Sequence, residues 1–302
     1  MEAYKIIDTI SRDEWLSARS VGIGASEMPI LMGESDWGSN LDIWAAKVGE
    51  GVKEDDDNEL KELGRELEDA ILRVTMRRAG VTLAHKGLLV RSLEHRWCIA
   101  TPDAITTDGE PVEVKNLSFG FSDEEWQEQI PEKYRIQCHH QMLATGAQRC
   151  LFGVLVWGNR IVWEWVPRDE LLIRRIIRTG YEFWGYVERH EMPPSDGHKN
   201  ARTFLEKRAT SEESIELYRD DIDEDVSRYA AANSRLVRLR AEVRDNERTR
   251  DAAADAIAKR MGAARHAVTA DGWECAWKRS ARKGYTVEPK ELDQFTIKEP
   301  KR

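Results

Sequence analysis

The sequence has few of the features that mark secreted, membrane-spanning or zinc-binding proteins. Only four cysteines occur among 302 residues, and none of them forms a CxxC pair. Such scattered cysteines are typical of a reducing cytoplasm and argue against a disulfide framework or a zinc ribbon. There is no run of about 20 apolar residues, which a membrane helix would need, and the first residues lack a secretory signal. We therefore expect a cytoplasmic protein that has no contact with a membrane.

An excess of basic residues is missing as well. The chain has 46 Lys and Arg against 55 Asp and Glu, which gives a formal net charge of -9. DNA binding draws on clustered basic side chains, so the acidic balance counts against a nucleic-acid partner. This exclusion is weak, because a DNA-processing enzyme needs only a local basic track, and a metal-dependent nuclease needs carboxylates.

The hydrophobic pattern of the first two thirds of the chain predicts a mixed α/β region. Apolar spacing and capping residues predict helices over 27–32 (with Ser26 as N-cap), 41–48, 59–78, 131–145 and 168–189. Short strands are predicted over 87–90, 97–101, 111–115, 150–157 and 160–166, the last two joined by Gly158-Asn159 as a hairpin turn. This order of elements indicates an α/β sandwich, with a sheet flanked by helices.

The remaining third reads as a helical extension. Residues 211–260 contain no glycine or proline, and apolar residues recur there at spacings of three and four. This predicts one long helix or a helical hairpin, serving interaction or oligomerisation. A small β-hairpin is predicted over 266–278, before a basic tail that we expect to be partly disordered. We therefore expect two domains, residues 1–200 and 201–302.

Two carboxylates and a lysine are the first candidates for chemistry. Asp103 follows a predicted strand, and Glu113 and Lys115 lie two residues apart on the next one. Residues two apart on a strand face the same side, and Asp103 reaches that side if the two strands pair. Such a group suits a hard divalent cation that orients a nucleophilic water. Taken alone, Glu113 and Lys115 are more simply read as a solvated ion pair.

Three further features lie on the predicted elements around this strand. Glu68, on the helix over 59–78, could add a third carboxylate, and Gln137 lies on the helix over 131–145, one turn before Gln141. Arg19, the Ser26 hydroxyl and the amides of the turn between them together suit a phosphate. Each of these residues, taken singly, is more simply a solvated or packing side chain.

Two adjacent histidines, His139 and His140, are a weaker candidate for a metal site. Neighbouring side chains on a helix point about 100° apart, so the two rings cannot chelate one ion well. We expect one histidine to be buried and the other exposed.

Four strings in a fixed order resemble the lambda exonuclease and YqaJ-type viral recombinase family, within the PD-(D/E)XK nuclease fold. They are GxGAS at residues 22–26, GxELE at 64–68, PD…ExK between 102 and 115, and YxxQ at 134–137. The resemblance covers roughly residues 14–190. It implies a restriction-endonuclease-like core, in which a central mixed sheet is flanked by helices, with the C-terminal helices and hairpin as an extension.

The resemblance also implies roles for the residues that match the motifs. Asp103, Glu113 and the Val114 carbonyl would hold one Mg²⁺, and Glu68 with Asp103 a second, with Mn²⁺ as a substitute. Lys115 would act with Glu113 and Asp103 in catalysis, by orienting the attacking water and offsetting charge on the phosphate. Three residues would bind the phosphate near the cut: Arg19, Ser26 and Gln137.

The activity implied is 5′→3′ exonuclease digestion of one strand of linear double-stranded DNA. The product is a 3′ single-stranded tail for a single-strand annealing protein, in phage-type recombination inside a bacterial host. A homo-oligomer, in some members of the family a ring trimer, is also implied. Two alternatives stay open: a structure-specific or nicking endonuclease that uses the same site, and a non-catalytic scaffold that binds DNA ends.

Overall fold

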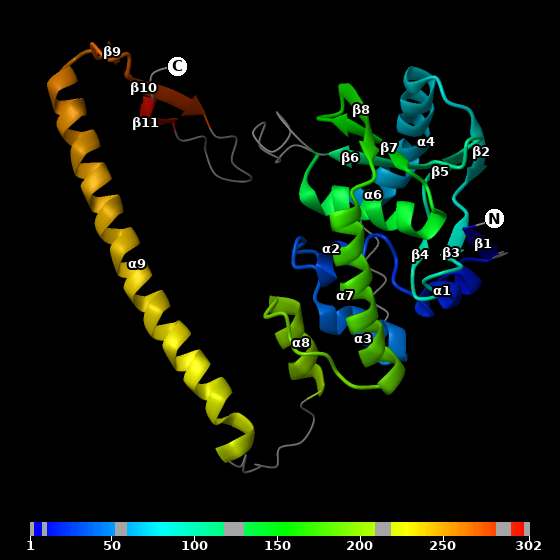
Figure 1. Ribbon diagram of the computed structural model, residues 1–302. Coiled ribbons are helices and arrows are strands. Elements are labelled where there is room, and N and C mark those ends of the chain that lie inside the picture. Colours follow the sequence, from blue (N-terminus) through cyan, green and yellow to red (C-terminus); the bar gives the residue numbers. More distant parts are fainter. Residues whose placement is uncertain are drawn as a thin grey trace. The chain divides into compact units, whose positions relative to one another are not determined.

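The computed structural model describes residues 3–7, 11–51, 59–117, 130–208, 219–281 and 291–298. The chain separates into two compact units, Met1–Ser211 and Glu212–Arg302 (Figure 1). The first unit is mixed α/β, and the second consists of one long helix and a small sheet. Over the described ranges, no helix combines the length and the apolar character needed to cross a membrane.

A mixed five-stranded sheet forms the centre of the first unit, in the order β2-β5-β6-β7-β8. Its strands are β2 (Leu83–Lys86), β5 (Ala104–Thr106), β6 (Pro111–Leu117), β7 (Arg149–Val156) and β8 (Arg160–Pro167). Strands β6 and β7 run parallel, and the other neighbours are antiparallel. A parallel pair needs a long crossover connection, and α6 (Glu132–Thr145) lies within the one between β6 and β7.

Different helices cover the two faces of this sheet. Val112 and Val114 of β6 belong to a buried cluster with side chains of α4 (Glu59–Ala79). Phe152 of β7 belongs to a second cluster, with side chains of α6. Because successive residues of a strand point to opposite faces, Glu113, which lies between the two valines, points towards α6.

The largest hydrophobic cluster joins α6 to four other helices of the first unit. They are α2 (Met28–Leu31), α3 (Asn40–Val48), α7 (Glu170–Arg189) and α8 (Lys199–Arg208), and a further helix, α1 (Arg12–Ser20), contacts α3. A small antiparallel sheet, in the order β1-β3-β4, is formed by β1 (Tyr4–Ile7), β3 (Leu89–Ser92) and β4 (Ile99–Ala100).

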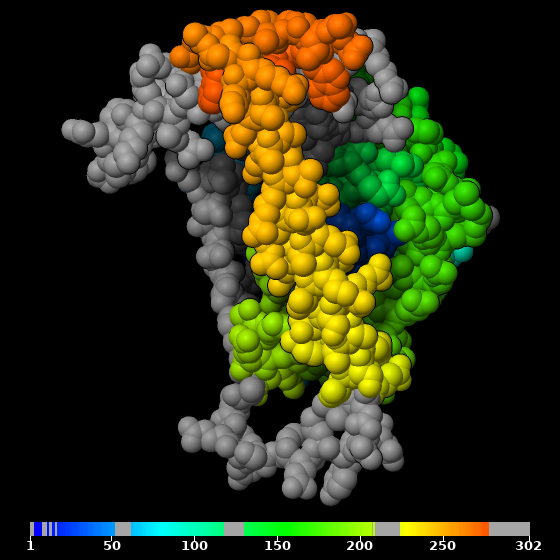
Figure 2. Space-filling view, turned by 90° about the vertical axis from the view of Figure 1, so that its left-hand side faces the viewer, coloured from blue at the N-terminus to red at the C-terminus, as the bar shows by residue number. Residues whose placement is uncertain are grey.

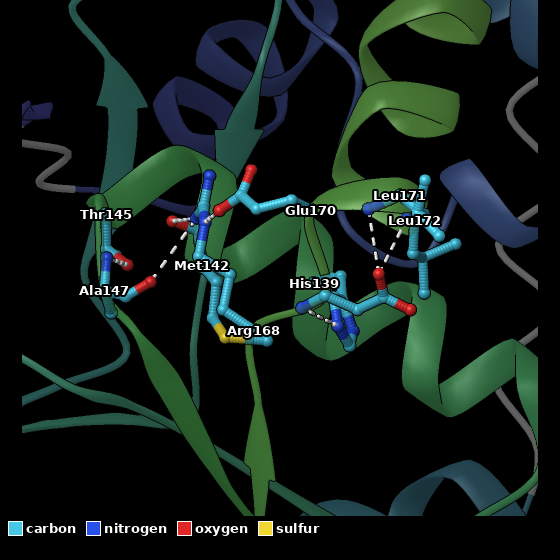
Figure 3. A network of polar contacts seen from close by, with 9 residues as sticks. His139, Met142, Thr145, Ala147, Arg168, Glu170, Leu171 and Leu172 are labelled. Atoms are coloured by element: carbon cyan, nitrogen blue, oxygen red, sulfur yellow. Dashed lines mark hydrogen bonds and ion pairs between the residues drawn. The ribbon is translucent and has the colours of Figure 1, made fainter.

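A network of polar contacts joins the end of α6 to the start of α7 (Figure 3). The Arg168 guanidinium donates to the carbonyl oxygens of Met142 (3.0 Å) and Ala147 (3.4 Å), at the C-terminal end of α6. His139 accepts a hydrogen bond from the Asp169 amide at 3.0 Å, and the Asp169 carboxylate caps α7. These contacts fix α6, which carries Gln137 and Gln141, against the rest of the unit.

The second unit contains α9 (Arg219–Met261) and the strands β9 (His266–Val268), β10 (Glu274–Ala281) and β11 (Glu291–Lys298). The strands form an antiparallel sheet in the order β11-β10-β9. Most described side chains of α9 are exposed, and Figure 2 shows them at the surface in yellow and orange. The exposed ones include Val226, Tyr229 and Leu236.

The predicted fold class is confirmed: a central mixed sheet is flanked by helices, and a C-terminal helix follows. The predicted helices match α2, α3, α4, α6 and α7, and the one over 211–260 matches α9 from Arg219, because residues 209–218 lie outside the described residues. The domain boundaries stay a prediction.

The structure differs from the sequence-based expectations about strands in three places. The sequence did not reveal β1, β2 and β5, which have four, four and three residues and show too few alternations. The hairpin turn is centred one residue earlier than expected, with Trp157 and Gly158 at positive φ (49° and 71°). Within the tail, Glu291–Lys298 forms a third strand that pairs with β10, and partial disorder of the tail stays a prediction.

Candidate active site

The Glu113 carboxylate is the centre of the candidate site. The residue is only 1% exposed, yet its carboxylate is surrounded by donors. Oxygen Oε1 accepts hydrogen bonds from Lys115 Nζ and Gln137 Nε2, and Oε2 accepts one from Gln141 Nε2. A buried carboxylate is tolerated when such donors satisfy its oxygens. The structure therefore brings the predicted Glu113, Lys115 and Gln137 together.

Asp103 reaches the same place by a different route from the one expected. It does not follow the strand that pairs with β6, because β4 belongs to the small sheet; instead it precedes β5, which pairs with β6 at Ala104↔Val112. One Asp103 oxygen accepts a hydrogen bond from the Val114 amide at 2.7 Å. Asp103, the residue just before β5 begins, thus contacts the backbone of β6 through its carboxylate.

Charges in this cluster act strongly on one another. Burial, and secondly the negative charge of Glu113, raises the pKa of Asp103 well above its usual range. Burial is also the main cause that raises the pKa of Glu68, although Lys86 acts in the opposite direction. Burial alone would lower the pKa of Lys115, but Glu113 and Asp103 raise it overall, so the ammonium stays charged.

The donor chemistry of this cluster suits a hard divalent cation. Its candidate ligands are carboxylate oxygens, which Mg²⁺ and Mn²⁺ prefer. Burial is the main cause that raises the pKa of Asp103 and Glu68, and a cation would favour the charged form of both carboxylates. In the part of the chain that the structure describes, no three Asp, Glu, His or Cys side chains are already grouped around one point. The residues fit a metal ion in kind, and the ligand set stays a prediction.

A second histidine holds the helix that carries the two glutamines. His140 Nε2 lies 3.0 Å from both the Ile23 and Ile99 carbonyl oxygens and donates to them. These oxygens belong to the glycine-rich turn and to β4, so the ring joins both to α6. His139 and His140 are 1% and 0% exposed. The expectation that one of them would be exposed was wrong, because α6 is enclosed on nearly all sides.

The structure brings only some of the groups that were predicted to bind phosphate into one place. Arg19 and Gly24 line a cavity of about 50 Å³ that Thr101 borders, two residues before Asp103. Ser26 is exposed, and it is not the N-cap of α2, which begins after Glu27. The Gly24 amide is not free for a phosphate either, because it donates to Glu27 at 2.7 Å. Gln137, in turn, lies on Glu113.

Sequence reasoning did not give a role to three residues near these groups. Gln141 binds Glu113, and Glu27 forms an ion pair with Lys47 at 2.8 Å. The four-residue spacing of Gln137 and Gln141 places both on one helix face, and this signal could have assigned Gln141. No local pattern joins Glu27, which directly precedes α2, to Lys47, which lies on α3.

The comparisons with known proteins agree with the motifs. A sequence model of the family described as the YqaJ-like viral recombinase domain matches residues 14–148. The chain is 30% identical over 203 residues to the uncharacterized protein YqaJ of Bacillus subtilis (strain 168), which covers 66% of this chain and 64% of that protein. The chain thus spans slightly less than two thirds of that relative.

Solved structures show the same fold at low sequence identity. The alkaline exonuclease LHK-Exo from Laribacter hongkongensis matches with a TM-score of 0.51 and 19% identity, over 65% of this chain and 100% of that one. LHK-Exo in complex with dAMP matches over the same shares, with a TM-score of 0.50 and 20% identity. At these identities the likeness concerns the fold.

Proposed function

We propose that this chain is a member of the family of YqaJ-like viral recombinase domains, whose sequence model matches residues 14–148, and that it is a metal-dependent DNA exonuclease. It would digest one strand of linear double-stranded DNA from the 5′ end and leave a 3′ single-stranded tail. The observation that carries this proposal is the buried Glu113 carboxylate, which Lys115 and two glutamines hold beside Asp103. The matching fold of an alkaline exonuclease supports it.

Each residue of the cluster has a task in phosphodiester hydrolysis. Glu68, Asp103, Glu113 and the Val114 carbonyl would hold Mg²⁺, with two ions in the site and Mn²⁺ as a substitute. When bound, such a cation supplies a nucleophilic water and stabilises charge on the phosphate. Lys115 keeps its proton and offsets the negative charge that develops on the phosphate oxygens. Gln137 and Gln141 hold the Glu113 carboxylate in one orientation.

Digestion of linear duplex DNA in Mg²⁺ tests the activity, with a 5′-phosphate on one strand only and closed circular DNA as a control. Selective loss of the phosphorylated strand with intact circles supports the 5′→3′ exonuclease. Cut circles would instead indicate an endonuclease that uses the same residues. Absence of cleavage in both Mg²⁺ and Mn²⁺ would leave a scaffold that binds DNA ends.

Two variants test the site itself. We expect Glu113→Gln and Lys115→Ala each to lower the cleavage rate by at least about 100-fold, since each removes a charge from the cluster. Arg189→Met removes a cation from an exposed ion pair with Glu191 and serves as the control. A near-normal rate in either site variant would refute the assignment.

The phosphate role centres on Arg19, which lines the cavity beside Gly24. A guanidinium matches two phosphate oxygens at once, so Arg19→Ala should lose the preference for 5′-phosphorylated ends. Equal loss on phosphorylated and hydroxyl ends would indicate a folding defect instead. For Ser26, which is exposed, and Gln137, which lies on Glu113, a phosphate role remains a prediction of the family resemblance.

The 3′ tail calls for a single-strand annealing protein as partner, in the cytoplasm of a bacterial host. We assign the nuclease to residues 1–200 and an interaction or oligomer role to 201–302. The division of the chain into two units after Ser211 supports this assignment, as do the exposed apolar side chains Tyr229 (70%) and Val243 (56%) on α9. Light scattering on the full chain and on a chain ending at Ser211 tests it. The same number of subunits per particle in both proteins would refute the oligomer role.

A further inference from the structure

A buried ion pair outside the carboxylate cluster joins three segments of the chain next to Arg19. Lys47, in the last turn of α3, donates to Glu27 Oε1 at 2.8 Å and to the Arg19 carbonyl oxygen at 3.0 Å. The other Glu27 oxygen accepts a hydrogen bond from the Gly24 amide at 2.7 Å. One ammonium and one carboxylate therefore tie together the end of α1, the glycine-rich turn and α3.

Both charged side chains of this ion pair are largely buried. The Lys47 side chain is 3% exposed and that of Glu27 is 19% exposed. Burial alone would raise the pKa of Glu27, but Lys47 and Arg19 lower it overall, so the carboxylate is ionised. Buried ion pairs give little net stability over apolar residues of the same size, because both charges lose their water. Stability alone therefore does not account for this pair.

The pair instead fixes the surroundings of one guanidinium. The Arg19 guanidinium lies 4.6 Å from the centroid of the Trp15 ring. It also lies so close to Gly24 that a Cβ placed there would be 2.9 Å from Nη2. Gly24 is the residue whose amide Glu27 holds, and the Arg19 carbonyl is the group that Lys47 holds. Both ends of the contact between Arg19 and Gly24 are thus anchored by the pair.

We propose that Glu27 and Lys47 are positioning residues that hold the Arg19 guanidinium ready for a terminal phosphate of DNA. This inference rests on the proposed function, which supplies the DNA end. The three side chains together carry one net positive charge, and of the three only Arg19 lines the cavity. A terminal phosphate monoester is an anion with several acceptor oxygens, whereas a hydroxyl end is neutral, so the pocket would distinguish the two.

Binding measured without catalysis tests this inference. Fluorescence anisotropy of the full chain in EDTA compares short labelled duplexes that carry a 5′-phosphate, a 3′-phosphate or hydroxyl ends only. We expect the wild type to bind the 5′-phosphorylated end about tenfold or more tightly than the others, as a charge-assisted contact provides. A wild type that binds all three ends equally would overturn the inference.

The decisive variant is Glu27→Gln combined with Lys47→Met, which removes both charges and nearly keeps the side-chain sizes. It should lose the preference for the phosphorylated end and bind the hydroxyl end as the wild type does. The single variant Lys47→Arg, which keeps the charge, should retain much of the wild-type preference that the double variant loses. The control is Arg189→Met with Glu191→Gln, an exposed ion pair (54% and 59%), which should change neither affinity.

Two results with the double variant would overturn the inference, provided that circular dichroism shows a folded chain. One is a preference as large as that of the wild type, and the other is an equal weakening for both ends. Gly24→Ala is a second route if the double variant does not fold. It keeps both charges but displaces the guanidinium, so an unchanged preference there would also contradict the proposal.

Digestion in Mg²⁺, run in parallel, separates this inference from the proposed function. If the wild type prefers the phosphorylated end but cleaves no DNA, the nuclease proposal fails and the pocket stands. If the wild type cleaves DNA and the double variant keeps the end preference, the nuclease stands and the role of Glu27 and Lys47 fails.

Discussion

We expect the free energy of unfolding of the first unit to fall as the pH drops from 6.5 towards 4, because of His140. Its Nε2–H is shared between the Ile23 and Ile99 carbonyl oxygens, and Nδ1 is buried without a hydrogen-bond partner among the described residues. A proton on Nδ1 would therefore be a buried donor without an acceptor. Burial lowers the pKa of His140 from 6.5 to about 4, although both carbonyl contacts favour the charged ring.

The sign and size of the effect follow from this pKa. Because the folded state resists the proton, the stabilisation is complete above pH 6.5 and is lost as the unfolded chain takes up the proton below it. At 1.36 kcal/mol per pKa unit, the full effect is about 3 kcal/mol, of which about 2.5 kcal/mol is lost by pH 4.5. The charges of Glu27 and Lys47 act on the pKa of His140 in opposite directions.

Urea unfolding of the wild type and of His140→Gln measures this effect. Tryptophan fluorescence is a suitable signal, because the Trp97 ring lies 6.1 Å from the His140 ring. Asp103 and Glu68 have a raised pKa and contribute with the opposite pH dependence, so only the difference between the two proteins isolates the histidine. That difference should shrink by about 2.5 kcal/mol between pH 7.5 and 4.5.

The control for this experiment is His85→Gln, a substitution of an exposed histidine. It should follow the pH profile of the wild type. If the wild type and His140→Gln differ by the same free energy at every pH from 7.5 to 4.5, the reasoning about the buried ring is refuted.

Three further substitutions have clear expected outcomes. Gly180→Ala should destabilise the first unit by about 1–3 kcal/mol in urea unfolding, because its Cβ would overlap the Trp97 ring, whereas Gly185→Ala on the same helix meets only a flexible arginine tip and should not. Thr75→Val should raise the free energy of unfolding by about 1 kcal/mol, because it removes a buried hydroxyl that has no partner among the described residues; a loss of stability would contradict this. Gln141→Leu should lower the DNA cleavage rate by roughly 10–100-fold, since it removes the donor to one oxygen of the buried Glu113 carboxylate on β6, and an unchanged rate would refute that role.

Local patterns were sufficient to predict the long elements of the fold. Helix α3 ends at Gly49 and α6 at Gly146, and both glycines have the positive φ that ends a helix. Strand β5 has only three residues, too few for an alternating pattern to be recognised. Because the sequence does not reveal β5, it predicts the strand before Asp103, instead of the strand after it, as the partner of β6.

The site was predictable where one element holds its residues and less so where the fold joins distant segments. Glu113 and Lys115 share a strand face, so their ion pair follows from a spacing of two. Gln137 was expected on a phosphate, but its amide binds Glu113, because the packing of α6 against β6 decides what a glutamine meets. The pairing of Glu27 with Lys47 depends on how α3 lies against the glycine-rich turn, which no local pattern encodes.

The hydrogen bond from the Val114 amide to Asp103 has a consequence for how such chains evolve. An acidic side chain that also completes a backbone ladder is retained for folding even after hydrolysis is lost. An aspartate or asparagine at position 103 is therefore weak support for activity in any relative of this protein. Lys115 is a quarter exposed and contacts the Glu113 carboxylate through its side chain. Under the proposed function, the residue at position 115 is therefore a better guide to activity in a relative than the residue at position 103.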